Sequence, residues 1–567
     1  MGDILLLTLR RLRVPLIALI VSYAISVLGL SLMPANPVPG QPGHMSLFHA
    51  FYVISYTATT IGFGEVPREF SDAQRAWVTF SIYLSVTAWA YALGSIFALA
   101  RDSTFRTAVA NSRFASRVRH LGEPFYIIAG YGQSGNALAH AFDDLGLRSV
   151  IIELQDDRAA QAEVEDYSTP PLFIAADARW PDVLCDAGAL HPQCQAVIVL
   201  VSDDEVAQAI AIGVTIMRPD LTVLARIYDK GSAVNLEDFP NIAVIDPFEA
   251  FALNLELNIA SPAVLWVEEW LSSAPGDPCP KPASTPGGHW LIFGFGRFGR
   301  AIAEALERSG STWSAFDSNS SLAQHPHLQI TDNSGQSLRE AGIGRAVGIV
   351  AGTDRDAMNL ALVTRARKLN PKLSVLIRQN HTTDRSLIAA AHADLAFVKS
   401  EVIVRECLQL LISPLLNRFL LMVRHRGKAV AEEIITRLLI ELDERVPSIW
   451  VFDCNASHPG LKEVLTNPGE DPLRLSELGI DPLDPPNRLR AVPLLLSRGD
   501  TSDMLPEGNT ILQDGDQILF AGAYGVRERQ SAFLRDPSPV DFVRTGFEAP
   551  RSWLFRKLRG MVRGKSS

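Results

Sequence analysis

One short segment, TATTIGFGEVP at residues 57–67, has residue types that could place backbone oxygens around a cation. Gly62 and Gly64 flank Phe63 inside an apolar region, where glycine would weaken an ordinary packed strand. Glycine is useful where the backbone must adopt φ values that a side chain disfavours, or must approach a ligand closely. The segment therefore predicts a loop whose carbonyl groups need a partner, and an ion is a suitable one.

Two longer segments repeat each other and could bind a phosphate. FYIIAGYGQSGNALAHAFDDLG starts at Phe125 and HWLIFGFGRFGRAIAEALERSG at His289, and each reads as a strand, G-x-G-x-x-G and a helix. The first glycine makes the turn, the second lets the backbone approach a pyrophosphate, and the third lets helix and strand pack. Free N–H groups at the start of the helix would face the phosphates. The candidate cofactor-binding residues of the two loops are Gly130, Gly132, Gln133, Ser134 and Gly135, and Gly294, Gly296, Arg297, Phe298 and Gly299.

An acid ends the second predicted strand of each repeat, Glu153 in the first and Asp317 in the second. Such an acid accepts hydrogen bonds from a ribose diol and repels a 2′-phosphate, which favours NAD or an adenine nucleotide over NADP. Asp177 and Asp332, which follow the next strand, are further candidate contacts. Two interpretations stay open: the glycines serve nucleotide binding, or only helix–strand packing. Arg297 would likewise pair with a phosphate or lie on the surface.

The elements that must hold the 57–67 loop are apolar. Val14–Met33 and Ala76–Ala100 carry no charge and are long enough to cross a bilayer as helices, whereas Ser46–Thr60 is too short and suits a re-entrant helix. A cleaved signal peptide is the alternative for the first span, but its apolar run is too long. Arginines precede the first span and follow the second, so both termini are expected in the cytoplasm of a multi-pass protein of the inner (cytoplasmic) membrane.

Composition excludes other classes. Of 567 residues, 47% are apolar and 20% charged, and the net charge of −10 argues against general nucleic-acid binding. Five cysteines without CxxC spacing indicate a reducing compartment and no zinc site. The chain contains no Ser-His-Asp, HExxH or Walker pattern, and we expect no enzyme.

The order of span, short helix, T-A-T-T-I-G-F-G-E loop and span resembles the pore of prokaryotic two-transmembrane potassium channels. The resemblance implies a selectivity filter in which Thr60, Ile61, Gly62 and Phe63 supply carbonyl oxygens to potassium. The Thr60 hydroxyl would form the innermost site and Gly64 would close the loop. One loop per chain implies a homotetramer. Three positions depart from the common pattern: Phe63 replaces a tyrosine whose hydroxyl ties the filter to the pore helix, Tyr56 replaces a glutamate, and Leu84 replaces a hinge glycine.

The repeated segments resemble the RCK (KTN, TrkA-N-like) domain that regulates potassium channels and transporters. Each has alternating strands and helices, typical of an α/β Rossmann-like parallel sheet, followed by an apolar helix, a Ser-Pro break and a second apolar helix that reads as a dimerisation surface. The expected parts are a membrane α-helical pore at 1–103, a linker helix at 104–121, RCK domains at 122–272 and 288–440, a Pro/Gly linker at 273–287, a small β-rich C-terminal lobe at 441–535 and a basic tail at 536–567.

The leading hypothesis is a ligand-gated potassium channel in the lipid bilayer, opened or closed by a nucleotide. Calcium is a further ligand to consider, because acidic pairs such as Asp156-Asp157 and Asp203-Asp204 bind it in some relatives, although solvated loop charge is the simpler interpretation. The alternatives are a membrane-anchored NAD-dependent oxidoreductase, for which neither repeat leaves room for a catalytic domain, and a regulatory subunit of a separate transporter, which would not need a pore loop of its own.

Overall fold

The computed structural model describes residues 2–37, 43–162, 165–273, 275–280, 285–319, 328–331, 335–466, 472–484 and 487–545. The chain forms two compact units. Residues 1–127, 150–165 and 170–194 make up the first unit, and the remainder makes up the second. The expected basic tail beyond residue 545 and the candidate residue Asp332 lie outside the described residues.

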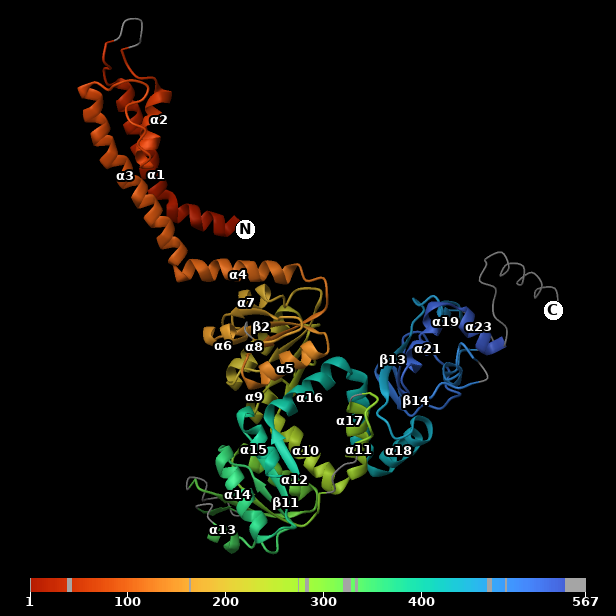
Figure 1. Cartoon of the computed structure of the whole chain (residues 1–567). Helices are drawn as coiled ribbons and strands as arrows, with labels where there is room; N and C mark the ends of the chain where they lie inside the picture. The colour runs from red at the N-terminus through yellow and green to blue at the C-terminus, as the bar shows by residue number, and fades with distance from the viewer. Residues whose placement is uncertain are drawn as a thin grey trace, which may run out of the picture. The chain divides into compact units, whose positions relative to one another are not determined.

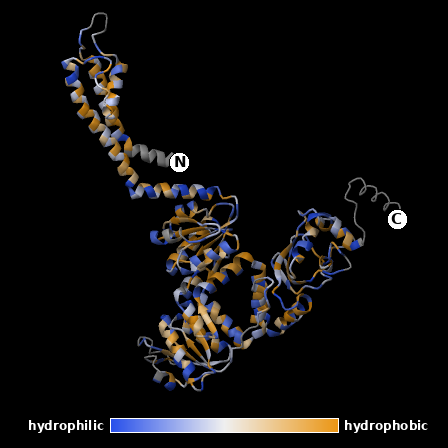
Figure 2. Cartoon of the chain, viewed as in Figure 1, coloured by the Kyte–Doolittle hydropathy of each residue, from blue (hydrophilic) through white to orange (hydrophobic). Residues whose placement is uncertain are grey.

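The first unit begins with three helices that pack side by side: α1 (Gly2–Leu32), α2 (Leu47–Ala58) and α3 (Asp72–Arg101) (Figure 1). Within the described residues, Leu12–Leu32 and Asp72–Arg101 are long and apolar enough to cross a membrane, whereas α2 is too short. Figure 2 shows the hydrophobic colouring of these helices. The predicted pattern of span, short helix and span is confirmed. A serine caps each later helix: Ser46 accepts from His49 N–H, and Ser71 forms a capping box with Gln74.

The contact between α1 and α3 is tight because one position lacks a side chain. A Cβ atom at Gly29 would lie 2.0 Å from the indole ring of Trp77. Trp77 in turn donates its Nε1–H to the carbonyl of Ser26, at 3.0 Å, and so pins the two helices in register. A small residue that admits a neighbour closely is the usual device of helix pairs in membranes.

Helix α4 (Ser103–Arg119) follows α3 after a single residue, Asp102, which caps it by accepting from Phe105 N–H. Phe114, Ala115 and Val118 are its buried residues. Val118 packs at Gly188, beyond α7 (Pro181–Asp186), and beside Phe125. The helix therefore joins α3 to the first of two α/β folds, both through the chain and through apolar packing.

The first fold is a six-stranded sheet in the order β3-β2-β1-β4-β5-β6, and its paired outer strands run parallel. This is the expected doubly wound α/β arrangement. Its strands are β1 (Phe125–Ala129), β2 (Arg148–Glu153), β3 (Leu172–Ala175), β4 (Cys194–Val199), β5 (Thr222–Arg226) and β6 (Ile242–Ile245), and its helices are α5 (Gln133–Asp144), α6 (Asp156–Ala162), α7, α8 (Asp204–Met217) and α9 (Lys230–Val234).

The second fold repeats the first, with strand order β12-β11-β10-β7-β8-β9 and parallel pairing throughout. Buried apolar residues fill both faces of its central strands, as expected for a parallel sheet covered by helices. Its strands are β7 (His289–Phe293), β8 (Thr312–Asp317), β9 (Leu328–Ile330), β10 (Gly348–Ala351), β11 (Ser374–Gln379) and β12 (Leu395–Val398), and its helices are α12 (Arg297–Arg308), α13 (Gly335–Glu340), α14 (Asp356–Leu369) and α15 (Arg385–Ala390).

The two folds exchange helices. Helix α10 (Pro247–Ala260) follows the first sheet yet packs on α12 of the second fold, through Phe248, Ala252 and Leu255. Helix α16 (Lys399–Ile412) follows the second sheet yet packs on α5 of the first fold. Each crossing helix therefore covers the glycine-loop helix of the other copy.

Beyond the Ser-Pro breaks, α11 (Pro262–Ser272) and α17 (Pro414–Arg426) join α18 (Lys428–Leu442) in one apolar core. Glu268 pairs there with Arg424. Helices α16 and α17 are together long and apolar enough for one bent membrane span, with an angle of 112° between them. Their burial against α5 and in the shared core accounts for that apolar character.

The last domain is a four-stranded antiparallel sheet in the order β13-β16-β14-β15, which confirms the expected β-rich lobe. A buried carboxylate, Asp516, is held by a bidentate pair with Arg498 at 2.7 Å. The elements are β13 (Ser448–Cys454), α19 (Lys462–Thr466), α20 (Leu475–Leu478), β14 (Ala491–Arg498), β15 (Thr501–Met504), β16 (Asp516–Gly522), α21 (Val526–Gln530), α22 (Ala532–Arg535) and α23 (Ser538–Thr545).

The Gly29 contact gives a stability prediction. Gly29→Ala places a methyl group against Trp77 and should destabilise the α1–α3 pair by about 1–3 kcal/mol, the usual cost of overpacking. Gly94→Ala in α3 is the control, because a Cβ atom there meets nothing within 4 Å. Thermal unfolding of the detergent-solubilised protein measures both variants. Equal melting temperatures for the two would contradict the proposed tight contact.

Candidate functional site

The backbone of the 57–67 loop alternates in handedness. Thr60, Gly62 and Gly64 have φ values of +64°, +64° and +89°, whereas Ile61 and Phe63 between them keep negative φ. A β-branched residue with positive φ is a genuine outlier, and such strain collects where function requires it. Alternation of this kind turns successive carbonyl groups of an extended segment toward the same side. A loop with this backbone can present a row of carbonyl oxygens to a cation.

A tyrosine of α2 ties this loop to the helix behind it. The Tyr56 hydroxyl donates to the Gly64 carbonyl, and the Tyr56 carbonyl accepts from Ile61 N–H at 2.9 Å. The ring of Phe63 lies edge-on to Tyr56, at 5.5 Å between centroids, and stacks with Tyr52 at 6.3 Å. Phe63 lacks the hydroxyl by which, in the channels that the loop resembles, a tyrosine ties the loop to the helix behind it. Here Tyr56 makes a tie of that type from the opposite direction, so the two departures compensate each other.

Glu65 anchors the end of the loop to α3. Its carboxylate accepts from Phe70 N–H at 2.8 Å and forms a bidentate pair with Arg75, at 2.8 and 3.1 Å. These hydrogen bonds, that of Arg75 first, lower the pKa of Glu65 to about 2. The side chain therefore keeps its negative charge, and the anchor its full strength, until the pH falls from about 4.5 toward 2.

The two glycine loops have nearly identical geometry. Gly130 and Gly294 have φ of +102° and +96°, and a Cβ atom at Gly135 or Gly299 would lie 2.1 Å from the carbonyl oxygen of Gly130 or Gly294. The first and third glycines are thus required by backbone conformation and close packing in both copies. Gly132 and Gly296 are the N-caps of α5 and α12, and neither makes a side-chain capping bond. The first N–H groups of both helices are therefore available to a phosphate.

The second loop lines a cleft of about 320 Å³, with Gly294 and Gly296, the β8 end at Asp317, the β10 end at Gly352–Arg355, and Arg378 of β11. A Cβ atom at Gly296 would meet nothing within 4 Å, so the backbone there is open to a ligand. Asp317 accepts from Phe295 N–H at 2.7 Å and from Asn319 N–H at 2.9 Å. It therefore orders the glycine loop and sits where a ribose would be recognised.

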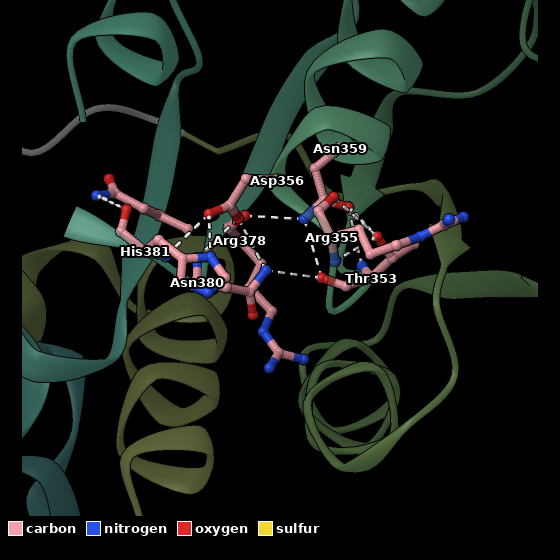
Figure 3. Close-up of polar contacts among 8 residues, drawn as sticks. Thr353, Arg355, Asp356, Asn359, Arg378, Asn380 and His381 are labelled. Atoms are coloured by element: carbon pink, nitrogen blue, oxygen red, sulfur yellow. Dashed lines mark hydrogen bonds and ion pairs between the residues drawn. The ribbon is translucent and has the colours of Figure 1, made fainter. Parts of the chain in front are cut away.

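A polar network fixes the wall of this cleft (Figure 3). The buried Asn359 accepts from Thr353 N–H and Oγ1–H and donates to the carbonyls of Thr353 and Arg378. Asp356 accepts at one oxygen from the backbone and side chain of Asn380, and at the other from His381 N–H and its ring. The β10–α14 turn is thereby tied to the end of β11, which gives the cleft a rigid side.

The hydrogen bonds already accepted by Asp356 argue against a calcium site at this carboxylate. Asp356, His381 and Asp384 lie close enough together to hold a metal ion, but both Asp356 oxygens already accept two hydrogen bonds. In the first fold, Asp204 likewise accepts from Tyr228 and Asp229 N–H, and Asp203 caps α8. Both Asp203 and Asp204 thus have a structural role.

The candidate residues of the first fold include a buried hydroxyl and two acids. Ser134 is 3% exposed, and its hydroxyl has no hydrogen-bond partner among the described residues, at the first turn of α5. Such an orphaned donor beside a glycine loop suits a phosphate oxygen. Glu153 is buried at the end of β2 and accepts from Gln155 N–H, as Asp317 does from Asn319. Asp177 pairs with Arg179 at 2.6 Å, and this pair lowers the pKa of Asp177.

Sequence reasoning missed the supporting groups Tyr56, Thr353, Asn359 and Arg378. Thr353 follows β10, Asn359 lies on α14 and Arg378 lies near the end of β11. In the sequence, only the matching acid after the fourth strand of each fold, Asp204 and Asp356, indicated this region. Gln133 follows the N-cap of α5, and Arg297 and Phe298 follow the N-cap of α12. Phe298 is buried in the core rather than exposed to the cleft.

Comparison with known proteins agrees with this geometry. The family model of the TrkA-N domain matches residues 126–247 and 290–399. Potassium channel protein 1 of Methanocaldococcus jannaschii is 27% identical over 180 residues, which cover 32% of this chain and 52% of that protein. The match thus spans about half the length of that relative.

Among solved structures, the GsuK channel bound to NAD is 15% identical, covers 94% of this chain and 99% of its own, and has a TM-score of 0.49. The human SLO3 gating ring is 10% identical, covers 71% of this chain and 99% of its own, and has a TM-score of 0.38.

The chain therefore carries a nucleotide-type α/β fold twice, behind two helices of membrane-spanning length. Both copies are TrkA-N (RCK) domains, which confirms the family resemblance that the sequence indicated.

The Tyr56 tie gives a prediction for the loop. Tyr56→Phe removes the donor to the Gly64 carbonyl, so backbone amides of residues 61–65 should exchange hydrogen faster, by about fivefold for a bond worth about 1 kcal/mol. Tyr52→Phe is the matched control, because its ring also contacts Phe63 but its hydroxyl makes no hydrogen bond with the described residues. Hydrogen exchange by mass spectrometry measures both. The same acceleration in both variants would show that ring packing, not the hydroxyl, holds the loop.

Proposed function

We propose that four copies of this chain form a potassium-selective channel of the inner membrane whose opening is controlled by nucleotides bound to the TrkA-N domains. Both termini lie in the cytoplasm in this proposal, and the chain has no enzymatic activity. Residues 60–63 coordinate potassium through their carbonyls and the Thr60 hydroxyl, and Gly64 closes the filter. Calcium is not part of the proposal, because Asp203, Asp204 and Asp356 are engaged in capping and turn contacts.

The observation that carries the pore is the alternating backbone at Thr60, Gly62 and Gly64. Strain in a loop between two spans is retained only where surrounding contacts over-determine it, here from Tyr56, Glu65 and Arg75. Non-helical backbone at membrane depth also needs a partner for its carbonyls. Potassium in a fourfold ring of such loops satisfies both requirements. The relative from Methanocaldococcus jannaschii is itself named a potassium channel protein.

Nucleotide control rests on the two glycine loops. Both leave the N–H groups of a helix start without a cap, and the second opens into a cleft bordered by Asp317. NAD or an adenine nucleotide fits these residues: the ribose on Glu153 or Asp317, and the phosphates on the loop. When bound, the nucleotide supplies charge and contacts that favour one conformation of the domain over another.

Such a shift would reach the pore through α4, which is one residue from α3 and is packed on the first fold at Val118. A ligand moves a closed–open equilibrium only by its different affinity for the two states. With four subunits, about 1 kcal/mol of preference per site sums to about 4 kcal/mol, close to the about 5.5 kcal/mol that reverses a two-state population.

The pore is tested by Gly62→Ala. In every subunit, the left-handed conformation at φ +64° costs an alanine about 1–2 kcal/mol. Its methyl group also disturbs the carbonyl groups of residues 60–63. We expect loss of potassium flux from proteoliposomes with the oligomer still assembled.

Gly43→Ala is the control, because Gly43 lies between α1 and α2 and outside residues 60–64, has no positive φ and has open space around a Cβ atom. Flux that persists in Gly62→Ala at the control's level would mean that residues 60–64 are not the filter.

Nucleotide binding is tested by Glu153→Ala in the full-length protein. Loss of a charged acceptor for the ribose should weaken NAD or ADP binding by about 10- to 100-fold, as expected for hydrogen bonds to a charged group. Basal potassium flux should stay at the parent level. Asp157→Ala removes an exposed charge nearby, on α6, and should leave affinity unchanged. Calorimetry that detects no nucleotide binding by the parent protein would end the nucleotide part of the proposal.

A further inference from the structure

Four cationic side chains meet where the two folds join, beside the second glycine loop. Arg226 ends β5 of the first fold, Arg297 begins α12, Arg378 lies near the end of β11, and Lys399 begins α16. We call these four residues the junction cluster. The guanidinium groups of Arg226 and Arg297 lie 5.2 and 4.6 Å from the ring centroid of Tyr228, so that one ring contacts both charges.

The junction cluster lacks carboxylate partners. No described carboxylate lies within 4 Å of its four charged groups, whereas other partly buried arginines of the same unit, such as Arg424 and Arg498, each have one. Arg226 is 6% exposed; it donates to the Val201 carbonyl, and its Nε–H has no hydrogen-bond partner among the described residues. Buried donors of this kind are normally satisfied, and buried charge is normally paired.

Lys399 is affected both by its burial and by the other three positive charges. Burial, with Arg226, Arg378 and Arg297, lowers the pKa of Lys399 to about 8. The acids whose charges act on the cluster are Asp246, on Arg297, and Asp354 and Asp356, on Arg378. Burial raises the pKa of Asp246 to about 6, and its carboxylate accepts from Phe248 and Glu249 N–H rather than from a cation.

The position of the cluster fits one part of a nucleotide. In the sheet order β12-β11-β10-β7-β8-β9, Asp317 lies on the β8 side of the glycine loop, and Arg378 and Lys399 on the β11–β12 side. Arg378 also lines the cleft, and Figure 3 shows it beside the fixed β10–α14 turn. A nucleotide with its ribose on Asp317 and its first phosphate at the start of α12 would direct its remaining phosphates toward the cluster.

We propose that the second cleft binds a nucleoside di- or triphosphate, whose terminal phosphate is held by Arg226, Arg297, Arg378 and Lys399. This inference rests on the proposed nucleotide binding and adds the ligand class: a free terminal phosphate rather than the uncharged nicotinamide end of NAD. Arg226 belongs to the first fold, so the ligand bridges the two copies. In the first copy Gln133 and Pro247 occupy the positions of Arg297 and Lys399, so this selectivity belongs to the second site.

The test is calorimetry of the full-length protein in nanodiscs, in the Glu153→Ala background, with ADP, AMP and NAD. Lys399→Gln should weaken ADP binding by at least about tenfold, the loss expected for a charged hydrogen bond, and AMP binding by less than about twofold. Lys230→Gln is the matched control: it removes an exposed lysine of the first fold that pairs with Glu249 and Glu304, and ADP affinity should not change.

A pH profile separates charge from packing. Between pH 7.5 and 9.5 the phosphates and Asp246 stay ionised while Lys399 loses its proton, so ADP affinity should fall. Lys399→Arg should keep that affinity and remove most of the fall, because arginine stays charged. Equal losses for ADP and AMP in Lys399→Gln, or a pH profile that is the same in Lys399→Arg, would overturn the terminal-phosphate site alone. Failure of all three nucleotides to bind would overturn it together with the proposed nucleotide control, leaving the potassium flux test unaffected.

Discussion

The structure of the membrane segment depends on one backbone constraint, the alternating handedness of residues 60–64. Contacts from the surrounding residues offset this backbone strain. Helix α2 ends where the left-handed Thr60 begins, Tyr56 donates to Gly64 from behind, and Glu65 fixes the other end to Arg75 of α3. The close α1–α3 contact at Gly29 then holds α3 in register with the loop. A short glycine segment thus sets the positions of three helices.

The same logic applies to the glycine loops of the two α/β folds. In each loop a left-handed glycine and a glycine with no space for a Cβ atom bring a helix start to the edge of the sheet. What differs is the surroundings. The first loop has a buried, unpartnered Ser134 hydroxyl, and the second has Arg297 and a cleft bordered by Arg378. Two copies of one scaffold therefore offer different chemistry to a ligand, and need not bind the same one.

The sequence predicted the strands, the glycine turns and the spans well, because each depends on a local period or on a residue type with a distinct backbone preference. It could not show that Tyr56 and Phe63 compensate each other, since that depends on the direction of a side chain across a turn. It also could not show the junction cluster. Arg226 and Lys399 are far apart in the chain and meet only because crossing helices α10 and α16 are exchanged between the folds.

This exchange has a mechanical consequence. Helix α10 covers α12, and α16 covers α5, so neither fold can move its glycine-loop helix without displacing a helix of the other. The buried pair of Glu268 and Arg424 and the shared core of α11, α17 and α18 bind the same two copies at the far side of the Ser-Pro breaks. In the proposed channel, a ligand at either loop would therefore act on a coupled pair of domains. Because α4 begins one residue after α3 and packs at Val118 against Gly188 and Phe125, a change in that part of the first fold would displace α4 and with it the end of α3.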